Sequence, residues 1–256
     1  MRHRFTIVLL ALAVVAAACG DDDAATSSSS TTIPSGTPTE VTLRFDFETG
    51  SEGWRSDIAD YTAPTRPEDF VSETGATPPT LEDEGSDFFR LAASNTSDDL
   101  FMFIRRPVGP ADGLVPEASY EIEFTVRVAS NAPTGCAGIG GAPGESVWLK
   151  VGAATSEPIP VREGDETRLS VDKGGQSEGG VAANVAGTIA NGIPCEEALD
   201  QDPQPYALIT LAEQFAGPVT AGDDGRLWLF VGTDSGFEGR TDLYYDRIEV
   251  VLRPIG

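Results

Sequence analysis

The sequence predicts an all-β protein, a two-sheet antiparallel β-sandwich of jelly-roll-like form. Short segments in which apolar and polar residues alternate recur along the chain, and this is the period of half-buried strands. Turn residues separate these segments, with 28 glycines and 18 prolines among 256 residues. No long segment has the period of an amphipathic helix. These features together favour a single sandwich domain over residues 41–256.

The first eighteen residues have the features of a bacterial export signal. Two arginines are followed by an apolar run that is too short to span a bilayer as a stable helix. The run ends in Ala16–Cys19, which resembles the lipobox of bacterial lipoproteins. That resemblance implies that Cys19 becomes the lipidated N-terminus of an extracytoplasmic protein anchored to the bacterial cell membrane. An ordinary cleaved signal with an incidental cysteine is the alternative.

Residues 19–40 are rich in serine, threonine and aspartate and contain almost no large apolar side chain. Such a segment cannot bury enough surface to offset its ordering entropy, so we expect a flexible tether. The domain then begins with an alternating strand over residues 41–47, which we expect to pair with the closing strand over residues 243–252.

Between these ends, residues 57–87 carry many turn residues and predict a long surface excursion with one short strand near Phe70. The clearest strand is 120–128, where every second residue is apolar, so that Phe124→Asp should prevent folding. Further strands are predicted over residues 88–91, 100–105, 146–151, 168–172, 206–211 and 227–231.

Two cysteines remain if Cys19 carries lipid. An unpaired thiol is uncommon in an exported protein, so Cys136 and Cys195 are predicted to form a disulfide. The bridge would bracket the glycine-rich segment 173–192, for which we predict a long polar loop but no specific role. The alternative, two cysteine metal ligands, lacks the close spacing of zinc sites.

Composition excludes several classes of function. Lys and Arg number 17 against 41 Asp and Glu, which gives a net charge of −24 and argues against a nucleic acid partner. The only histidine, His3, lies in the predicted signal, so the mature chain cannot use Ser-His-Asp or Cys-His catalysis or build a His-containing zinc site. Carboxylate-based hydrolysis and binding of hard cations remain open.

The last strand places a carboxylate among apolar residues. Strict alternation puts Asp246 on the same face as Tyr244 and Ile248, and an inward carboxylate is costly unless it is paired with a cation or several donors. The alternatives are a bound cation and a carboxylate that accepts backbone hydrogen bonds.

The two ends of the domain carry short motifs. Phe47–Glu48 and Gly53–Trp54 near the start, with Tyr245–Ile248 near the end, resemble the signature ends of the galactose-binding-like jelly rolls that include many carbohydrate-binding modules. In that superfamily a first-strand glutamate and a last-strand aspartate commonly contribute to a structural calcium ion. The resemblance therefore implies calcium at Glu48 and Asp246.

Two tryptophans are out of phase with the predicted core. Trp148 and Trp228 alternate with apolar residues and share their phases with Lys150 and Arg226, so they are candidates for stacking on sugar rings. Packing between layers is the alternative for both. Trp54 is expected to close one end of the sandwich.

These features predict a non-catalytic binding module on the cell surface, with carbohydrate as ligand and calcium as a structural ion. The alternatives are a structural or protein-binding cell-envelope domain and a glycoside hydrolase that uses two carboxylates. With 41 acidic residues, no spacing singles out a catalytic pair.

Overall fold

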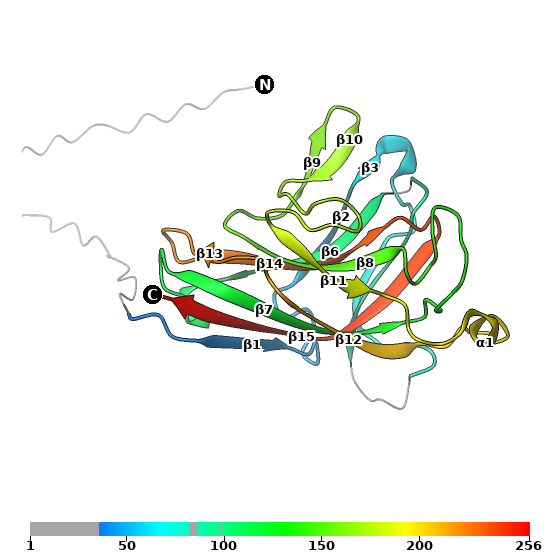
Figure 1. Cartoon of the computed structure of the whole chain (residues 1–256), viewed down its shortest axis with the longest axis horizontal. Coiled ribbons are helices and arrows are strands. Elements are labelled where there is room, and N and C mark those ends of the chain that lie inside the picture. The colour runs from blue at the N-terminus through cyan, green and yellow to red at the C-terminus, as the bar shows by residue number, and fades with distance from the viewer. Residues whose placement is uncertain (1–35, 82–86, 98) are drawn as a thin grey trace, which may run out of the picture. The chain divides into compact units, whose positions relative to one another are not determined.

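The computed structural model describes residues 36–81, 87–97 and 99–256 (Figure 1). The predicted signal, Cys19 and the tether up to residue 35 lie outside this range. None of the helices in the described part has the length and apolar character needed to cross a membrane. The strands are β1 Val41–Phe45, β2 Arg55–Ala59, β3 Tyr61–Thr62, β4 Val71–Ala76, β5 Phe88–Ser94, β6 Leu100–Val108, β7 Ser119–Ser130, β8 Val147–Ala154, β9 Pro160–Glu163, β10 Glu166–Leu169, β11 Ala183–Thr188, β12 Ala207–Gln214, β13 Val219–Thr220, β14 Leu227–Ser235 and β15 Arg240–Ile255. The described residues also include a short α-helix, α1 Cys195–Leu199, and single 3-10 turns over Ala63–Thr65 and Pro110–Asp112.

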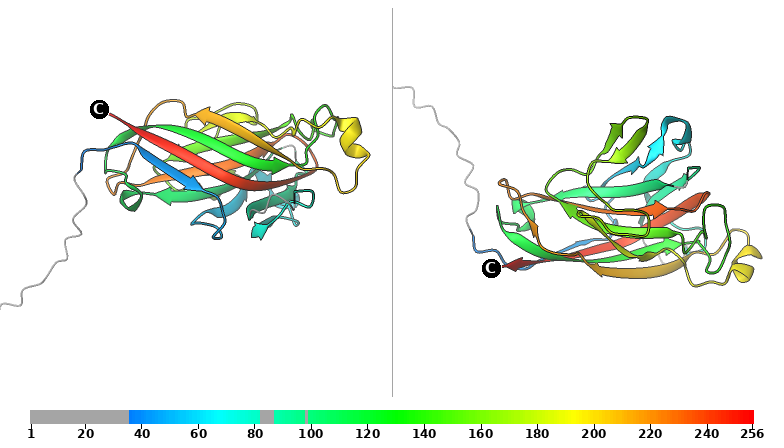
Figure 2. Two further views of the ribbon diagram at one scale, coloured as in Figure 1. Left: turned by 90° about the horizontal axis from the view of Figure 1, so that it is seen from below. Right: turned by 45° about the horizontal axis from the view of Figure 1, so that its top comes forward.

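Two antiparallel sheets form the sandwich. The larger runs β12-β7-β15-β5-β4, with β1 on β15 and β13 on β7, and the smaller runs β11-β8-β14-β6-β2. The two layers are visible in Figures 1 and 2. The two ends of the domain pair directly, with Val41 opposite Leu252 and Phe45 opposite Ile248. The predicted all-β, jelly-roll-like sandwich is therefore confirmed.

The sandwich core follows the alternating pattern of the sequence. On β7 all five residues of the apolar phase, including Phe124, are fully buried. Leu227, Leu229 and Val231 of β14 face the same core from the opposite layer. Trp54 is buried at 2% exposure with its ring edge-on to Phe45, as expected for a residue that closes the sandwich.

A second apolar layer covers the outer face of the five-stranded sheet. Phe101, Phe103 and Phe230 point outward from β6 and β14, and apolar residues between β10 and β11 pack on them to form an outer-face cluster. The segment 170–182, here called the covering loop, crosses this face. Gly152 of β8 permits the close approach, because a side chain there would collide with the Phe230 ring and the Ala182 carbonyl. A third, small sheet, β3-β10-β9, stands above the same layer (Figure 1).

Two sequence predictions need correction. The short strand predicted near Phe70 is β4, but residues 57–87 also contain part of β2 and all of β3, which were not predicted because strands of five and two residues carry little periodic signal. The segment 173–192 likewise contains β11, which pairs with β8.

The alternation on β15 also breaks. A bulge lies between Tyr245 and Arg247, so Tyr245 joins the sandwich core together with Ile248, whereas Tyr244 packs in a separate cluster on the other face. The predicted common face of Tyr244 and Ile248 is therefore wrong, and Asp246 occupies the bulge.

Candidate functional site

A polar cleft of about 500 Å³ lies beside the covering loop. Its walls come from four places: the β2–β3 connection with β3, the β5–β6 connection, the small-sheet strands β9 and β10, and the first part of the covering loop. Tyr61, Thr62, Ser97, Ser170 and Gln176 present an aromatic ring, hydroxyl groups and an amide to it. The cleft therefore offers several hydrogen-bonding groups around one aromatic side chain.

Asp60 enters the cleft from a tight turn between β2 and β3. Its φ of 60° lies in the left-handed region, which aspartate tolerates better than most residues. Its backbone N–H donates to the Thr167 carbonyl at 2.6 Å, which ties the turn to β10. Such backbone strain is typical of functional sites, and here it holds a carboxylate against the ammonium group of Lys173.

A network of buried charges lies at the base of the cleft. The Lys173 ammonium contacts Asp60 Oδ2 at 2.9 Å and Asp234 Oδ2 at 2.5 Å. Asp234 Oδ2 also contacts the Lys150 ammonium at 2.9 Å, and both of these side chains are fully buried. The Lys173 ammonium additionally lies 5.3 Å from the centre of the Phe101 ring. Charges buried this deeply persist because they are paired.

Lys150 also holds the covering loop in place. Its ammonium donates to the carbonyl oxygens of Lys173 and Glu178, each at 3.0 Å, and to that of Gly175. Asp172 closes the neck of the loop by accepting from the Gly174 and Val181 N–H groups, both at 3.0 Å. The Lys150 ammonium group thus binds three loop carbonyls and one carboxylate, an arrangement of oxygens that is also typical of a metal-ion site.

The electrostatic balance of the network sets the protonation of its members. Asp99 is exposed at the cleft, but desolvation of its carboxyl by the surrounding groups, and then the nearby Asp234 carboxylate, raise its pKa to about 7. Burial lowers the pKa of Lys150 despite its contact with Asp234. Burial alone would also lower the pKa of Lys173, but Asp234 and Asp60 outweigh it and raise that pKa. The Asp99 carboxyl therefore gains or loses its proton near neutral pH.

Three of these carboxylates could hold a metal ion. One oxygen from each of Asp60, Asp99 and Asp234 lies within 4.8 Å of the others, and Asp234 Oδ1 is buried without a hydrogen-bond partner. Oxygen ligands of this kind suit calcium. The two ammonium groups already bind the same carboxylates, however, and they would repel a divalent ion placed among them.

Sequence reasoning did not identify this network. Lys150 was noted only for sharing the phase of Trp148, although a lysine on a strand flanked by apolar residues is itself a signal of a buried cation. The five charged residues lie on separate segments between residues 60 and 234. Nothing in the sequence indicates that these segments meet.

The residues predicted to bind calcium lie near the paired ends of the domain. Glu48 is exposed just after β1, and Asp246 is buried at 7% exposure in the β15 bulge. The Arg127 guanidinium lies 3.3 Å from the Asp246 carboxylate. An arginine therefore supplies a positive charge at this carboxylate, and calcium at Glu48 and Asp246 stays a prediction.

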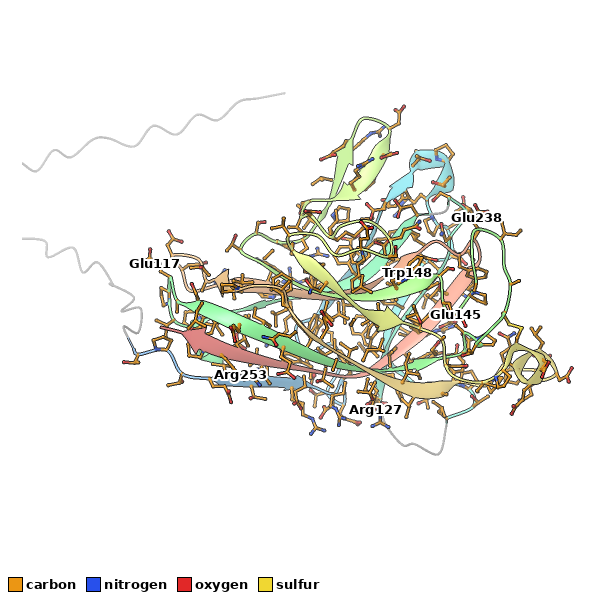
Figure 3. The ribbon with its side chains drawn as sticks, viewed as in Figure 1. Glu117, Arg127, Glu145, Trp148, Glu238 and Arg253 are labelled. Atoms are coloured by element: carbon orange, nitrogen blue, oxygen red, sulfur yellow. A yellow bond between two sulfur atoms is a disulfide. The ribbon has the colours of Figure 1, made fainter. Side chains whose placement is uncertain are left out.

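Trp148 and Trp228 both lie on the outer-facing phase of the five-stranded sheet and are partly buried. Trp148 is opposite Asp234 in the register, so six residues of β14, roughly 20 Å, separate the two tryptophans. Trp148, on β8, is labelled in Figure 3. A side chain added at Gly236 would contact both Trp148 and Gln176, so Trp148 lies beside a residue of the cleft wall. Their predicted role in ligand binding stays a prediction.

The predicted disulfide between Cys136 and Cys195 is present. It joins the β7–β8 connection to the first residue of α1, and it indicates an oxidising, extracytoplasmic compartment. Both half-cystines also line a smaller cavity of about 240 Å³, together with the apolar residues Ile189, Leu199 and Phe237.

No family model matches the chain, and no curated protein matches it. Among solved structures, it is similar to the enzymatically active domain of tailspike protein 4 from bacteriophage CBA120, with 11% identity and a TM-score of 0.35 over 82% of this chain and 20% of that one. The chain thus corresponds to about a fifth of the tailspike structure.

Two carbohydrate-binding modules also match. The C-terminal family 22 module of Clostridium thermocellum Xyn10B has 13% identity and a TM-score of 0.32 over 84% of this chain and 94% of its own. The mannan-recognising module TmCBM27 has 12% identity and a TM-score of 0.35 over 84% and 98%. Similarities this distant carry no argument about ligand or activity, and the fold class rests on the strand pairing described above.

Proposed function

We propose that this domain is a non-catalytic module that binds carbohydrate in the cleft beside the covering loop. The observation that carries the proposal is the composition of the cleft wall, in which the Tyr61 ring lies among hydroxyl, amide and carboxylate groups. Sugar hydroxyls both donate and accept hydrogen bonds, and the faces of sugar rings are apolar, so this mixture suits them. The volume of about 500 Å³ falls within the range of roughly 300–1,000 Å³ common for small-ligand sites.

A glycan array probed with the full-length chain tests this proposal. We expect binding that is weakened by Gln176→Ala, in the cleft wall, and by Trp148→Ala beside it. Trp228→Ala separates two arrangements, because Trp228 lies roughly 20 Å from Trp148. Loss of binding in both tryptophan variants would indicate a ligand that runs along the sheet and uses both predicted stacking residues. Retention in Trp228→Ala alone would confine the ligand to the cleft.

We also propose that the module is exported and attached to the cell membrane through a lipid on Cys19. The signal-like residues 1–18 and Cys19 support lipid attachment, and the disulfide supports export. Growth of the producing cells with a radioactive fatty acid should label the protein, and a Cys19→Ser variant should carry no label. An unlabelled wild-type protein would leave only a soluble exported module.

We also propose that the domain binds a structural calcium ion. An ion held by Glu48 and Asp246 would stabilise the junction of the two chain ends, so chelation should lower the melting temperature and added calcium should restore it. If the melting temperature does not respond, the contact of Asp246 with Arg127 accounts for the buried carboxylate without an ion.

A protein-binding role is the second candidate. Leu199 is 63% exposed and lines the apolar cavity beside the disulfide, where a protein partner could bury it. If no glycan on the array is bound, the protein-binding role is favoured, whereas release of sugar from a glycoside would favour a hydrolase.

A further inference from the structure

The charges of the cleft define its ligand more narrowly than the fold does. Five carboxylates and two cationic groups line the cleft, an excess of three negative charges. These groups are Asp60, Asp99, Glu163, Glu166, Asp172, Arg168 and Lys173. An anionic ligand such as a sulfated glycan or a uronic acid polymer would be repelled from this surface.

Both cationic groups are already bound to carboxylates. Arg168 Nε donates to Glu166 Oε2 at 2.7 Å, and the Lys173 ammonium is held between Asp60 and Asp234. In the described part of the chain, no ammonium or guanidinium group lies within ion-pair distance of Asp99 or Glu163. The excess negative charge is therefore located on carboxylates that a ligand can reach.

A buried oxygen of Asp234 lacks a hydrogen-bond donor when the neighbouring Asp99 carboxyl is ionised. Asp234 is fully buried, and its Oδ1 has no hydrogen-bond partner among the described residues. The Asp234 carboxylate lies within 4.8 Å of oxygens from Asp60 and Asp99, both of which line the cleft. An unpartnered charged oxygen is costly in such a position, so a donor arriving through the cleft would be bound favourably.

The charge count of the network specifies what that donor is. With Asp99 ionised, three carboxylates, Asp60, Asp99 and Asp234, face two ammonium groups, those of Lys150 and Lys173, which leaves one uncompensated negative charge. A single positive charge completes the balance. An ammonium group carries that charge and three donors, whereas a divalent ion would overshoot the balance and lie against two ammonium groups.

From this geometry we infer that the cleft selects a glycan bearing free amino groups, which bind as ammonium at Asp99 and the neighbouring carboxylates. The inference rests on the proposed carbohydrate-binding function and narrows its ligand class. Thr62, Ser97 and Ser170 also line the cleft, and their hydroxyl oxygens, which already hydrogen-bond within the chain, can accept from sugar hydroxyls while the ammonium group faces Asp99.

Protons compete with such a ligand. Asp99, directly before β6, faces Asp60 after β2, Asp234 on β14 and Lys173 of the covering loop, with Lys150 on β8 behind Asp234. A proton on Asp99, whose pKa is about 7, supplies the same missing positive charge. Amine binding should therefore weaken below pH 7, although the ligand amine is itself more fully charged there.

Calorimetric titration of the full-length chain tests the inference. The probes are a glucosamine tetramer, its N-acetylated counterpart and a galacturonate tetramer, at pH 5.5 and pH 7. At pH 7 we expect the amine to bind about tenfold or more tightly than the N-acetylated form, as one charge-assisted hydrogen bond provides, with no binding of galacturonate. The preference should shrink at pH 5.5.

Asp99→Asn should abolish the preference, while Asp200→Asn, which removes an exposed charge after α1, should retain it. Equal binding of the amine and N-acetylated tetramers would overturn the inference and leave the carbohydrate-binding proposal intact. Failure of every glycan on the array and in the titration would overturn both.

Discussion

Lys150→Met tests the role of the buried ammonium group most directly. Methionine keeps most of the apolar stem of lysine and removes only the charge and its donors. The change deprives three loop carbonyls and one oxygen of Asp234 of their shared donor, in a side chain that is fully buried. We expect both a loss of stability and release of the covering loop.

The magnitude follows from the contacts that remain. Removing one partner of a buried ion pair costs about 3–5 kcal/mol, because the other charge is left buried and unpaired. Here Asp234 keeps Lys173 at 2.5 Å, and the loop carbonyls can reach water if the loop opens, so the lower end, about 3 kcal/mol, applies. For a domain of this size that corresponds to a fall in melting temperature of roughly 6–12 °C.

Urea unfolding and hydrogen exchange together provide the assay. The unfolding midpoint should fall with an unchanged slope, and amides of residues 173–181 should lose protection while those of β7 keep theirs. Arg253→Met is the control, because Arg253 forms only exposed ion pairs with Glu40 and Glu123. A Lys150→Met protein with wild-type stability and a protected loop would refute the reasoning.

Three further outcomes are expected. Replacing both Cys136 and Cys195 by serine opens a loop closed over 59 residues and should cost about 4 kcal/mol in denaturant unfolding, and a change below 1 kcal/mol would contradict the chain-entropy argument. Phe124→Asp puts an unpaired carboxylate at a fully buried site and should abolish cooperative unfolding in near-ultraviolet circular dichroism, unlike Glu121→Asp on the exposed phase of the same strand. Asp99 has a folded pKa of about 7 against an ordinary value of 3.8, so between about pH 4 and pH 7 the folded protein holds a proton that the unfolded chain has lost. Its contribution makes stability fall as pH rises through that window, and Asp99→Asn should flatten the profile; an identical slope in both proteins would show that Asp99 is not the group responsible.

The sequence predicted those features that depend on local pattern. The alternating pattern of β7 predicted its buried face correctly, because the side chains of its apolar phase pack in the core between the two sheets. The pairing of β1 with β15 follows from two such patterns at the chain ends. The disulfide followed from counting cysteines in an exported chain. The bulge at Asp246 could not be predicted, since one inserted residue reverses the phase without altering composition.

The charge network escaped prediction for a different reason. Its members approach one another only because β8, β14, the β2–β3 turn and the covering loop meet on one face of the sheet. Short strands such as β3, with two residues, carry no periodic signal, yet they position Asp60. The spacing of charges along the chain therefore holds no information about this site, which is formed entirely by tertiary contacts.

The outer face of the five-stranded sheet explains why the cleft lies where it does. Both tryptophans that the sequence indicates as stacking candidates lie on this face, but Phe101, Phe103 and Phe230 occupy its middle, beneath the covering loop. A ligand that contacted Trp148 and Trp228 together would have to expel the loop and expose these three rings, at a cost of about 1.5–3 kcal/mol for each ring. A ligand in the cleft uses the edge of the loop as a wall and leaves the rings covered. Binding in the cleft should therefore depend on Lys150. This residue does not contact the ligand, but it holds the covering loop that forms one wall of the cleft.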